Sequence, residues 1–177
     1  MTGMAQEKSH IISAIVSNES GVLTRISGLF ARRCYNIDSL AVCATEDPAC
    51  SRMTIVVRGD ENVLRQIILQ LGKLPDCKIT GELSANNSVL RELLLVKINA
   101  PAEKIAQIET VARTYEAKIV DLSPDSIVLE LTGKPSKIDG FIEVLKPYGI
   151  LELSRTGLTA LERGGGKLNN TETSQTE

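Results

Sequence analysis

Residues 11–33 read IISAIVSNESGVLTRISGLFARR, and the fold of the chain can be worked out from this stretch. Residues 11–16 are almost wholly apolar, which predicts a strand in the middle of a sheet. From Val22 onward the apolar residues recur at the spacing of an amphipathic helix that packs on that sheet. The turn between strand and helix is polar and contains Gly21. This order aims the first free N–H groups of the helix at whatever lies above the turn.

Three further strands and a second helix follow before residue 84. Short apolar and alternating patterns predict strands over residues 37–44, 51–58 and 77–83. A second amphipathic helix begins after Asp60, a residue type favoured as a helix N-cap. The order β-α-β-β-α-β is that of the ferredoxin-like fold.

The same order of elements returns in the second half of the chain. A short polar segment, residues 85–88, is the predicted linker. Pro101 and Pro135 each lie where a helix is expected to begin. The predicted elements are a strand over 90–98, a helix from Pro101, strands over 117–122 and 127–131, a helix from Pro135 and a strand over 150–153. The chain is therefore predicted to be an α+β protein of two tandem ferredoxin-like βαββαβ domains.

The predicted boundaries follow from this repeat. The first domain is expected over residues 10–84 and the second over residues 89–163. Residues 1–9 are predicted to be a flexible leader. Residues 164–177, which begin with consecutive glycines and continue as a polar run, are predicted to be a disordered tail.

The composition argues against several classes of protein. The 177 residues carry a formal net charge of −2, without the basic surplus of a nucleic-acid-binding protein. No apolar run reaches the ~18 residues that a membrane span needs. The start of the chain is polar and lacks the apolar core of a signal peptide, so a cytoplasmic protein is expected. Neither nucleic acid nor a membrane is an expected partner.

The residues that most enzymes rely on are scarce. There is one histidine, His10, so neither a His/Cys metal cluster nor a Ser-His-Asp triad is readily built. The four cysteines show no CxxC spacing and are expected to be reduced and mostly buried. No Walker loop is present, and no GxGxxG follows a predicted strand. We therefore predict no catalytic residue, no metal site and no cofactor in this chain.

Two other kinds of protein share this topology, and the sequence argues against both. RNA-recognition modules need exposed aromatic residues on the middle strands, where this chain has aliphatic residues and serine. Metal-carrier domains need paired cysteines in the first loop, and residues 17–21 contain none. A module that binds a small ligand is the interpretation that is left.

The turn between the first strand and the first helix is the candidate binding site. The N–H groups of Gly21, Val22 and Leu23 are candidates to hold a carboxylate, helped by the positive end of the helix dipole. Gly21 also allows a ligand to approach the backbone closely. The amide of Asn18 can both donate and accept hydrogen bonds. The competing interpretation is that Asn18 or Ser20 only caps the helix.

A second candidate group lies at Asn36, whose side-chain carbonyl could accept a hydrogen bond from an ammonium group. A carboxylate site and an ammonium site are together the minimum for holding a zwitterionic amino acid. Asn36 can equally serve only to allow a left-handed turn. The corresponding first turn of the second half, residues 99–102, has no glycine, and its Pro101 lacks an N–H group. A ligand loop is therefore expected only in the first half.

Several short stretches are distinctive enough to compare with known families. They are NESGVLTRISGLF (18–30), YNIDSL (35–40), Asp47-Pro48, SRMTI (51–55), LVKI (95–98) and SRTG (154–157). Together they closely resemble the regulatory (small) subunit of acetohydroxyacid synthase, also called acetolactate synthase. The resemblance covers roughly residues 10–163.

The resemblance implies a fold and a ligand site. The first domain would be an ACT domain, a ferredoxin-like module that binds amino acids, and the second domain would be ACT-like. ACT domains of two chains would pair side by side as a homodimer, with a branched-chain amino acid, usually valine, at their interface. The implied ligand-binding residues are Asn18, Ser20, Gly21, Val22 and Leu23 of one protomer and Asn36 and Ile37 of the other.

The resemblance also implies a partner. The chain would be a non-catalytic subunit that stimulates the large catalytic subunit of acetolactate synthase and confers feedback inhibition, in valine, leucine and isoleucine biosynthesis. Thiamine diphosphate, Mg and FAD are expected on the catalytic subunit, and no cofactor on this one. The alternative is a stand-alone amino-acid sensor that acts on another enzyme or a transcription factor. Direct DNA binding is not expected because the chain has no basic helix-turn-helix segment.

One residue departs from the family pattern. The family usually has glycine before Tyr35-Asn36-Ile37, where this chain has Cys34. If the backbone there is left-handed, cysteine costs about 1 kcal/mol relative to glycine. Such strain could shift the turn that carries Asn36.

Overall fold

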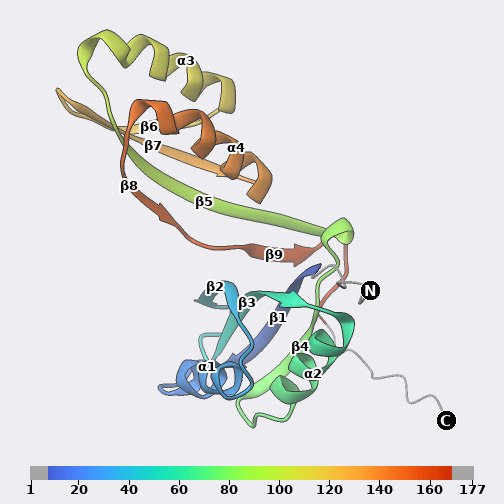
Figure 1. Ribbon diagram of the computed structural model, residues 1–177. Helices are drawn as coiled ribbons and strands as arrows, with labels where there is room; N and C mark the ends of the chain where they lie inside the picture. Colours follow the sequence, from blue (N-terminus) through green and yellow to red (C-terminus); the bar gives the residue numbers. More distant parts are fainter. Residues whose placement is uncertain (1–7, 169–177) are drawn as a thin grey trace. The chain divides into compact units, whose positions relative to one another are not determined.

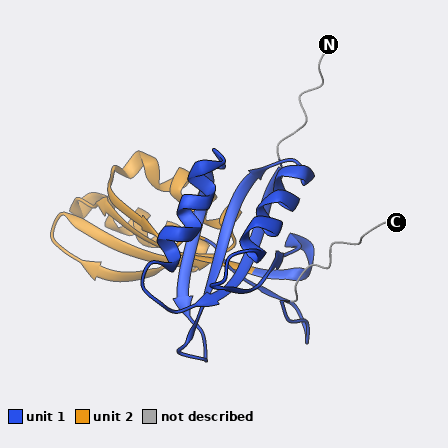
Figure 2. Ribbon diagram, turned by 90° about the horizontal axis from the view of Figure 1, so that it is seen from below, with its two compact units in different colours: residues 1–89, 158–177 blue, residues 90–157 orange. Residues whose placement is uncertain are grey.

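The computed structural model describes residues 8–168. The chain divides into two compact units, one of residues 1–89 and 158–177 and the other of residues 90–157 (Figure 2). Most of the predicted leader and tail, residues 1–7 and 169–177, lies outside the described residues. Lys8 and Ser9, which were predicted to belong to the leader, are the first residues of a strand.

The first unit contains a four-stranded antiparallel sheet with the strand order β2-β3-β1-β4. Its elements are β1 (Lys8–Ser17), α1 (Val22–Arg32), β2 (Ile37–Ala44), β3 (Cys50–Gly59), α2 (Glu61–Gly72) and β4 (Cys77–Glu82). This is the predicted βαββαβ order, and β1 and β3 are the central strands as predicted. Both helices lie on one face of the sheet (Figure 1).

The apolar pattern of each element explains this packing. The stripe on α1 is buried at Val22, Ile26, Leu29 and Phe30, which pack into one core with the central strands. The second helix begins where its cap was predicted, because the Asp60 side chain accepts a hydrogen bond from the Val63 N–H at 2.8 Å.

The second unit repeats the topology with the strand order β6-β7-β5-β8. The remaining elements of the chain are η1 (Ala85–Asn87), β5 (Ser88–Asn99), η2 (Ala102–Lys104), α3 (Ile105–Tyr115), β6 (Lys118–Leu122), β7 (Ser126–Gly133), α4 (Pro135–Leu145), η3 (Lys146–Tyr148), β8 (Ile150–Arg155) and β9 (Thr159–Glu162). Pro135 opens α4 as predicted. Pro101 precedes the short turn η2, so α3 begins four residues later than predicted. The predicted fold class, two tandem ferredoxin-like domains, is confirmed.

The structure divides the C-terminal part differently from the prediction. The second unit ends at residue 157, and the segment with β9 belongs to the first unit. In that unit Leu158 is buried and its N–H group donates to Ser39 Oγ at 3.0 Å. Strand β9 pairs with β5, whose first two residues also belong to the first unit. The sequence did not reveal β9 because it is four residues long and has no counterpart in the first repeat.

The four cysteines were expected to be reduced and mostly buried. The cysteines are free thiols, but the prediction that most are buried is wrong, because Cys34 and Cys43 are exposed and only Cys50 is buried.

No helix of the described residues is both long enough and apolar enough to span a bilayer.

Cys34 occupies a left-handed position, with φ of 56°. It follows α1, and hydrogen bonds from its N–H to Ala31 O and from Tyr35 N–H to Phe30 O close the helix end. A side chain at such a position costs about 1 kcal/mol that glycine avoids. The strain proposed for this turn is therefore present.

We expect Cys34→Gly to raise the free energy of unfolding by about 1 kcal/mol, because glycine removes the Cβ from the left-handed residue. Urea denaturation of the two proteins measures the difference. Cys34→Ala is the matched control, since it removes the sulfur but keeps the Cβ. An equal gain in both variants would attribute the effect to the thiol instead.

Candidate functional site

The loop of residues 18–21 connects β1 to α1, and no side chain caps the helix. The N-cap residue is Gly21, with φ of 82°, and it has no side-chain cap hydrogen bond. The Asn18 amide instead donates from Nδ2 to Pro48 O at 2.9 Å and accepts at Oδ1 from Ser51 Oγ at 3.1 Å. The interpretation that Asn18 or Ser20 only caps the helix is therefore wrong. Asn18 fastens the loop to the turn between β2 and β3.

The loop presents backbone donors at the positive end of α1. Among the described residues, the N–H groups of Gly21 and Leu23 have no acceptor. The Val22 N–H reaches Glu19 O only at 3.5 Å. Such a first turn favours an anion, because its N–H groups and the helix dipole point the same way. Of the side chains here, Val22 is buried in the core and Leu23 is 48% exposed.

An ion pair that the sequence did not predict holds the other side of the loop. Arg25 of α1 donates to Asp76 from Nε at 2.6 Å and from Nη2 at 2.9 Å. The backbone carbonyl of Asp76 accepts from the Ser17 N–H at 2.8 Å. A Cβ added to Gly21 would lie 3.2 Å from Arg25 Nη1. A guanidinium therefore lies beside the backbone donors, with its charge paired to the Asp76 carboxylate.

The Arg25–Asp76 pair gives the first unit a pH dependence. The hydrogen bond from Arg25 lowers the pKa of Asp76 from its ordinary value. Stability from a lowered carboxyl pKa is complete above the unfolded-state pKa and is lost as the pH falls through the folded-state pKa. We therefore expect Asp76→Asn to unfold at a lower urea concentration than the parent at neutral pH. The difference in unfolding midpoint between Asp76→Asn and the parent should shrink as the pH falls below the ordinary aspartate pKa and disappear below the lowered pKa of Asp76.

The matched control for this measurement is Asp125→Asn, which removes an exposed carboxylate that has no hydrogen-bond or ion-pair partner among the described residues. A gap between Asp76→Asn and the parent that is independent of pH would contradict the assignment.

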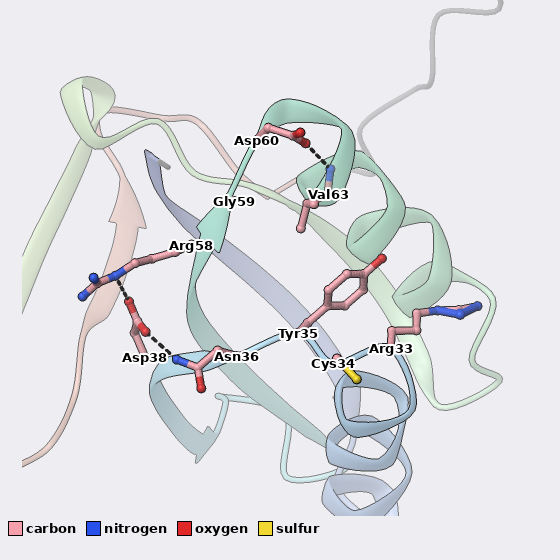
Figure 3. Close-up of a pocket in the computed structure, with 9 residues that line it drawn as sticks. All are labelled: Arg33, Cys34, Tyr35, Asn36, Asp38, Arg58, Gly59, Asp60 and Val63. Carbon is pink, nitrogen blue, oxygen red and sulfur yellow. Dashed lines mark hydrogen bonds and ion pairs between the residues drawn. The ribbon is translucent and has the colours of Figure 1, made fainter. Parts of the chain in front are cut away.

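Asn36 lies immediately before β2, in a chain of polar contacts. Its Nδ2 donates to Asp38 Oδ1 at 2.8 Å, and Asp38 Oδ2 accepts from Arg58 Nε at 2.6 Å (Figure 3). These contacts leave the Asn36 carbonyl oxygen without a partner among the described residues. Asn36 is not left-handed, so the interpretation that it only allows such a turn is wrong; Cys34 has that role. An open pocket borders Asn36 between the end of α1 and the start of α2.

The loop and Asn36 lie at opposite ends of the sheet. Strands β1 and β2 are both antiparallel to β3, so they run parallel to each other. Through β3, Ile37 is in register with His10, near the start of β1, and Ala44 with Val16, near its end. The eight residues of β2 separate these ends by roughly 20–25 Å. One amino acid cannot reach from the Gly21 loop to Asn36 of the same chain.

The predicted site residues therefore form two groups. Asn18, Ser20, Gly21, Val22 and Leu23 lie together on the loop, and Asn36 and Ile37 lie together at the start of the edge strand β2. From Leu40 to Ala44 this edge strand is apolar, and Val42 is 44% exposed. An unpaired, exposed and apolar edge strand is suited to pairing with another strand.

Comparisons with known proteins agree over most of the chain. Residues 12–78 match the family described as AHAS small subunit-like ACT domain, and residues 91–164 match the family described as small subunit of acetolactate synthase. The probable acetolactate synthase small subunit of Methanothermobacter thermautotrophicus is 46% identical over 157 residues, 88% of this chain and 94% of that protein. The acetolactate synthase small subunit of Mycolicibacterium smegmatis is 44% identical over 156 residues, 88% of this chain and 92% of that protein.

Comparison with solved structures also finds an acetolactate synthase small subunit. The acetolactate synthase small subunit from Thermotoga maritima superposes with a TM-score of 0.84 at 34% identity, covering 90% of this chain and 99% of that one. Sequence, topology and both family matches agree, and the chain belongs to the family of acetolactate synthase small subunits.

Proposed function

We propose that this chain is a regulatory subunit that stimulates the catalytic subunit of acetolactate synthase and makes it sensitive to feedback inhibition by valine. The observation that supports the ligand part is that the Gly21 loop and Asn36 lie at opposite ends of the edge strand β2. The family match supports the partner and disfavours a stand-alone sensor. The catalysis, with thiamine diphosphate, Mg and FAD, belongs in this proposal to the large subunit in the cytoplasm.

A two-fold dimer through β2 completes the site. If β2 pairs antiparallel with β2 of a second chain, the start of the partner's strand lies next to the end of this chain's β2. The Gly21 loop is on that side, because Asn18 fastens it to the turn between β2 and β3. Asn36 of the partner subunit is thereby brought toward the loop. Two identical sites result, each with one half from each protomer.

The chemistry of the two halves suits a small apolar amino acid. The carboxylate of the ligand accepts from the Gly21 and Leu23 N–H groups, next to Arg25. Its ammonium group donates to the carbonyl of the partner's Asn36. The exposed side chain of Leu23 and the half-buried side chain of the partner's Ile37 offer apolar surface to a branched side chain.

Binding across two protomers accounts for regulation. A ligand that touches both chains favours the dimer arrangement in which the halves meet over any other arrangement. Coupling of about 1–3 kcal/mol is typical and changes the affinity or activity of a partner severalfold or more. The large subunit then responds to the dimer arrangement and not to valine itself.

Reconstitution tests the proposal. The purified chain is added to the acetolactate synthase catalytic subunit of the same organism, and the rate of acetolactate formation is measured with and without valine. We expect the rate to rise on addition of the chain and to fall again with valine. Calorimetric titration with valine, leucine and isoleucine ranks the ligands. A rate that is unchanged by the chain at any ratio would overturn the regulatory assignment.

A further inference from the structure

Three potential metal ligands come together where β3 passes into α2. His10 belongs to β1, Glu61 is the first residue of α2, and Glu82 is the last residue of β4. Their ligand atoms all lie within 4.8 Å of one another. No part of the proposed valine regulation uses these residues.

The hydrogen-bond partners of the His10 imidazole indicate which species can lie between His10 and Glu82. The imidazole is 5% exposed, and its Nε2 lies 3.2 Å from the Gly59 carbonyl oxygen. A carbonyl only accepts, so Nε2 carries the hydrogen. Its Nδ1 lies 2.9 Å from Glu82 Oε1, which as a carboxylate oxygen is also an acceptor. Two facing acceptors at this distance need a positive species between them, either a proton or a metal ion.

We propose that His10, Glu61 and Glu82 form a binding site for a divalent transition-metal ion such as zinc. Imidazole nitrogen and carboxylate oxygen are both ligand types that such ions accept. The hydrogen bond from Nε2 to Gly59 O is the outer contact that metal-binding histidines usually make, and it turns Nδ1 toward the carboxylates. The sequence argued against a metal because of the single histidine; the two carboxylates supply the ligands that further histidines would.

The two carboxylates keep the site accessible from solvent. The Glu82 side chain is 40% exposed and Glu61 is exposed, so an ion can enter without opening the core. Glu61 has no hydrogen-bond or ion-pair partner among the described residues, so its carboxylate is available to the ion. A bound ion would join the start of β1, the end of β4 and the first turn of α2, and so stabilise the first unit.

Metal titration of the full chain tests this site. The protein is freed of metal with a chelator and titrated with Co²⁺ and with Zn²⁺, followed by visible absorption and calorimetry. We expect one ion per chain, a rise in the thermal unfolding midpoint with excess Zn²⁺, and a weaker affinity at acidic pH as protons compete. The cobalt spectrum should lack the sulfur charge-transfer band that the free cysteines would give.

Substitution of the proposed ligands tests whether the ion binds at this site or elsewhere on the chain. His10→Gln and Glu61→Gln should each weaken binding by more than the ~10–100-fold that loss of an outer-shell partner costs. Glu61→Gln removes an exposed carboxylate and leaves the core intact, which keeps the test valid if His10→Gln fails to fold. Glu109→Gln, on the exposed face of α3, is the matched control and should bind as the parent does.

Three results would overturn the proposal. One is the absence of saturable binding, which leaves a proton as the species between His10 and Glu82. Another is unchanged binding in Glu61→Gln, and the third is a sulfur charge-transfer band, which would assign the ion to cysteine. Reconstituted valine regulation can succeed or fail independently of each of these results.

Discussion

Gly21→Asp should abolish valine inhibition while the chain still stimulates the catalytic subunit. The new carboxylate would stand at the N-terminus of α1, where the proposed site holds the carboxylate of valine. Like charges placed together at an interface cost several kcal/mol, so we expect valine affinity to fall by at least about 100-fold. The added Cβ would also lie 3.2 Å from Arg25 Nη1, so the guanidinium would have to move.

Strain at a left-handed residue has to be separated from the charge. Gly149→Asp is the matched control, because Gly149 has φ of 84° and belongs to the second unit. Acetolactate formation by the reconstituted enzyme is measured over a range of valine concentrations with each variant. Full valine sensitivity in Gly21→Asp would remove the loop from the site. Loss of sensitivity in Gly149→Asp would show that the effect comes from backbone strain.

Val42→Arg should separate the dimer and abolish valine binding, while each protomer keeps its fold. Val42 lies on the edge strand β2 and is 44% exposed in the single chain, so no core packing is lost. In a symmetric dimer through β2 the substitution places two positive charges at one interface. Charged residues on an edge strand oppose strand pairing. We expect the dimer to weaken by at least about 100-fold, since like-charge contacts cost several kcal/mol.

Size-exclusion chromatography with light scattering measures the mass of the variant, and calorimetry measures its valine binding. Val144→Arg is the matched control, because Val144 is 39% exposed on α4 in the second unit. A Val42→Arg protein that stays dimeric and binds valine would place the interface elsewhere.

Local periodicity was enough to predict the order of the main elements, because the helices and the central strands each bury one face in the core of their own unit. The α1 stripe predicted from Val22 onward is buried, and Asp60 caps α2 as its position indicated. Strand β9 could not be found in this way, because its pairing with β5 connects residues far apart in the chain. Its four residues carry too few alternations to stand out from a loop.

The sequence predicted the free backbone N–H groups of the candidate loop but not the contacts that hold the loop in place. A glycine before a helix indicates exposed N–H groups, and the structure has them at Gly21. The ion pair of Arg25 with Asp76 joins residues 51 positions apart, and nothing in either local sequence reveals it. The distance from the loop to Asn36 likewise depends on strand order. The family resemblance implied a site divided between two protomers, and the assembled sheet adds the physical reason, because the Gly21 loop and Asn36 lie at opposite ends of the sheet.

The central claim is that valine binds between two chains, and mixed dimers test it most directly. Gly21→Asp and Asn36→Ala chains are unfolded together, refolded and titrated with valine by calorimetry, with mixed dimers verified by native mass spectrometry. Each variant alone should lack high-affinity sites. A mixed dimer combines both defects in one site and leaves the other intact, so random pairing restores about a quarter of the sites at parental affinity. Mixed dimers without any high-affinity site would contradict a site shared between protomers.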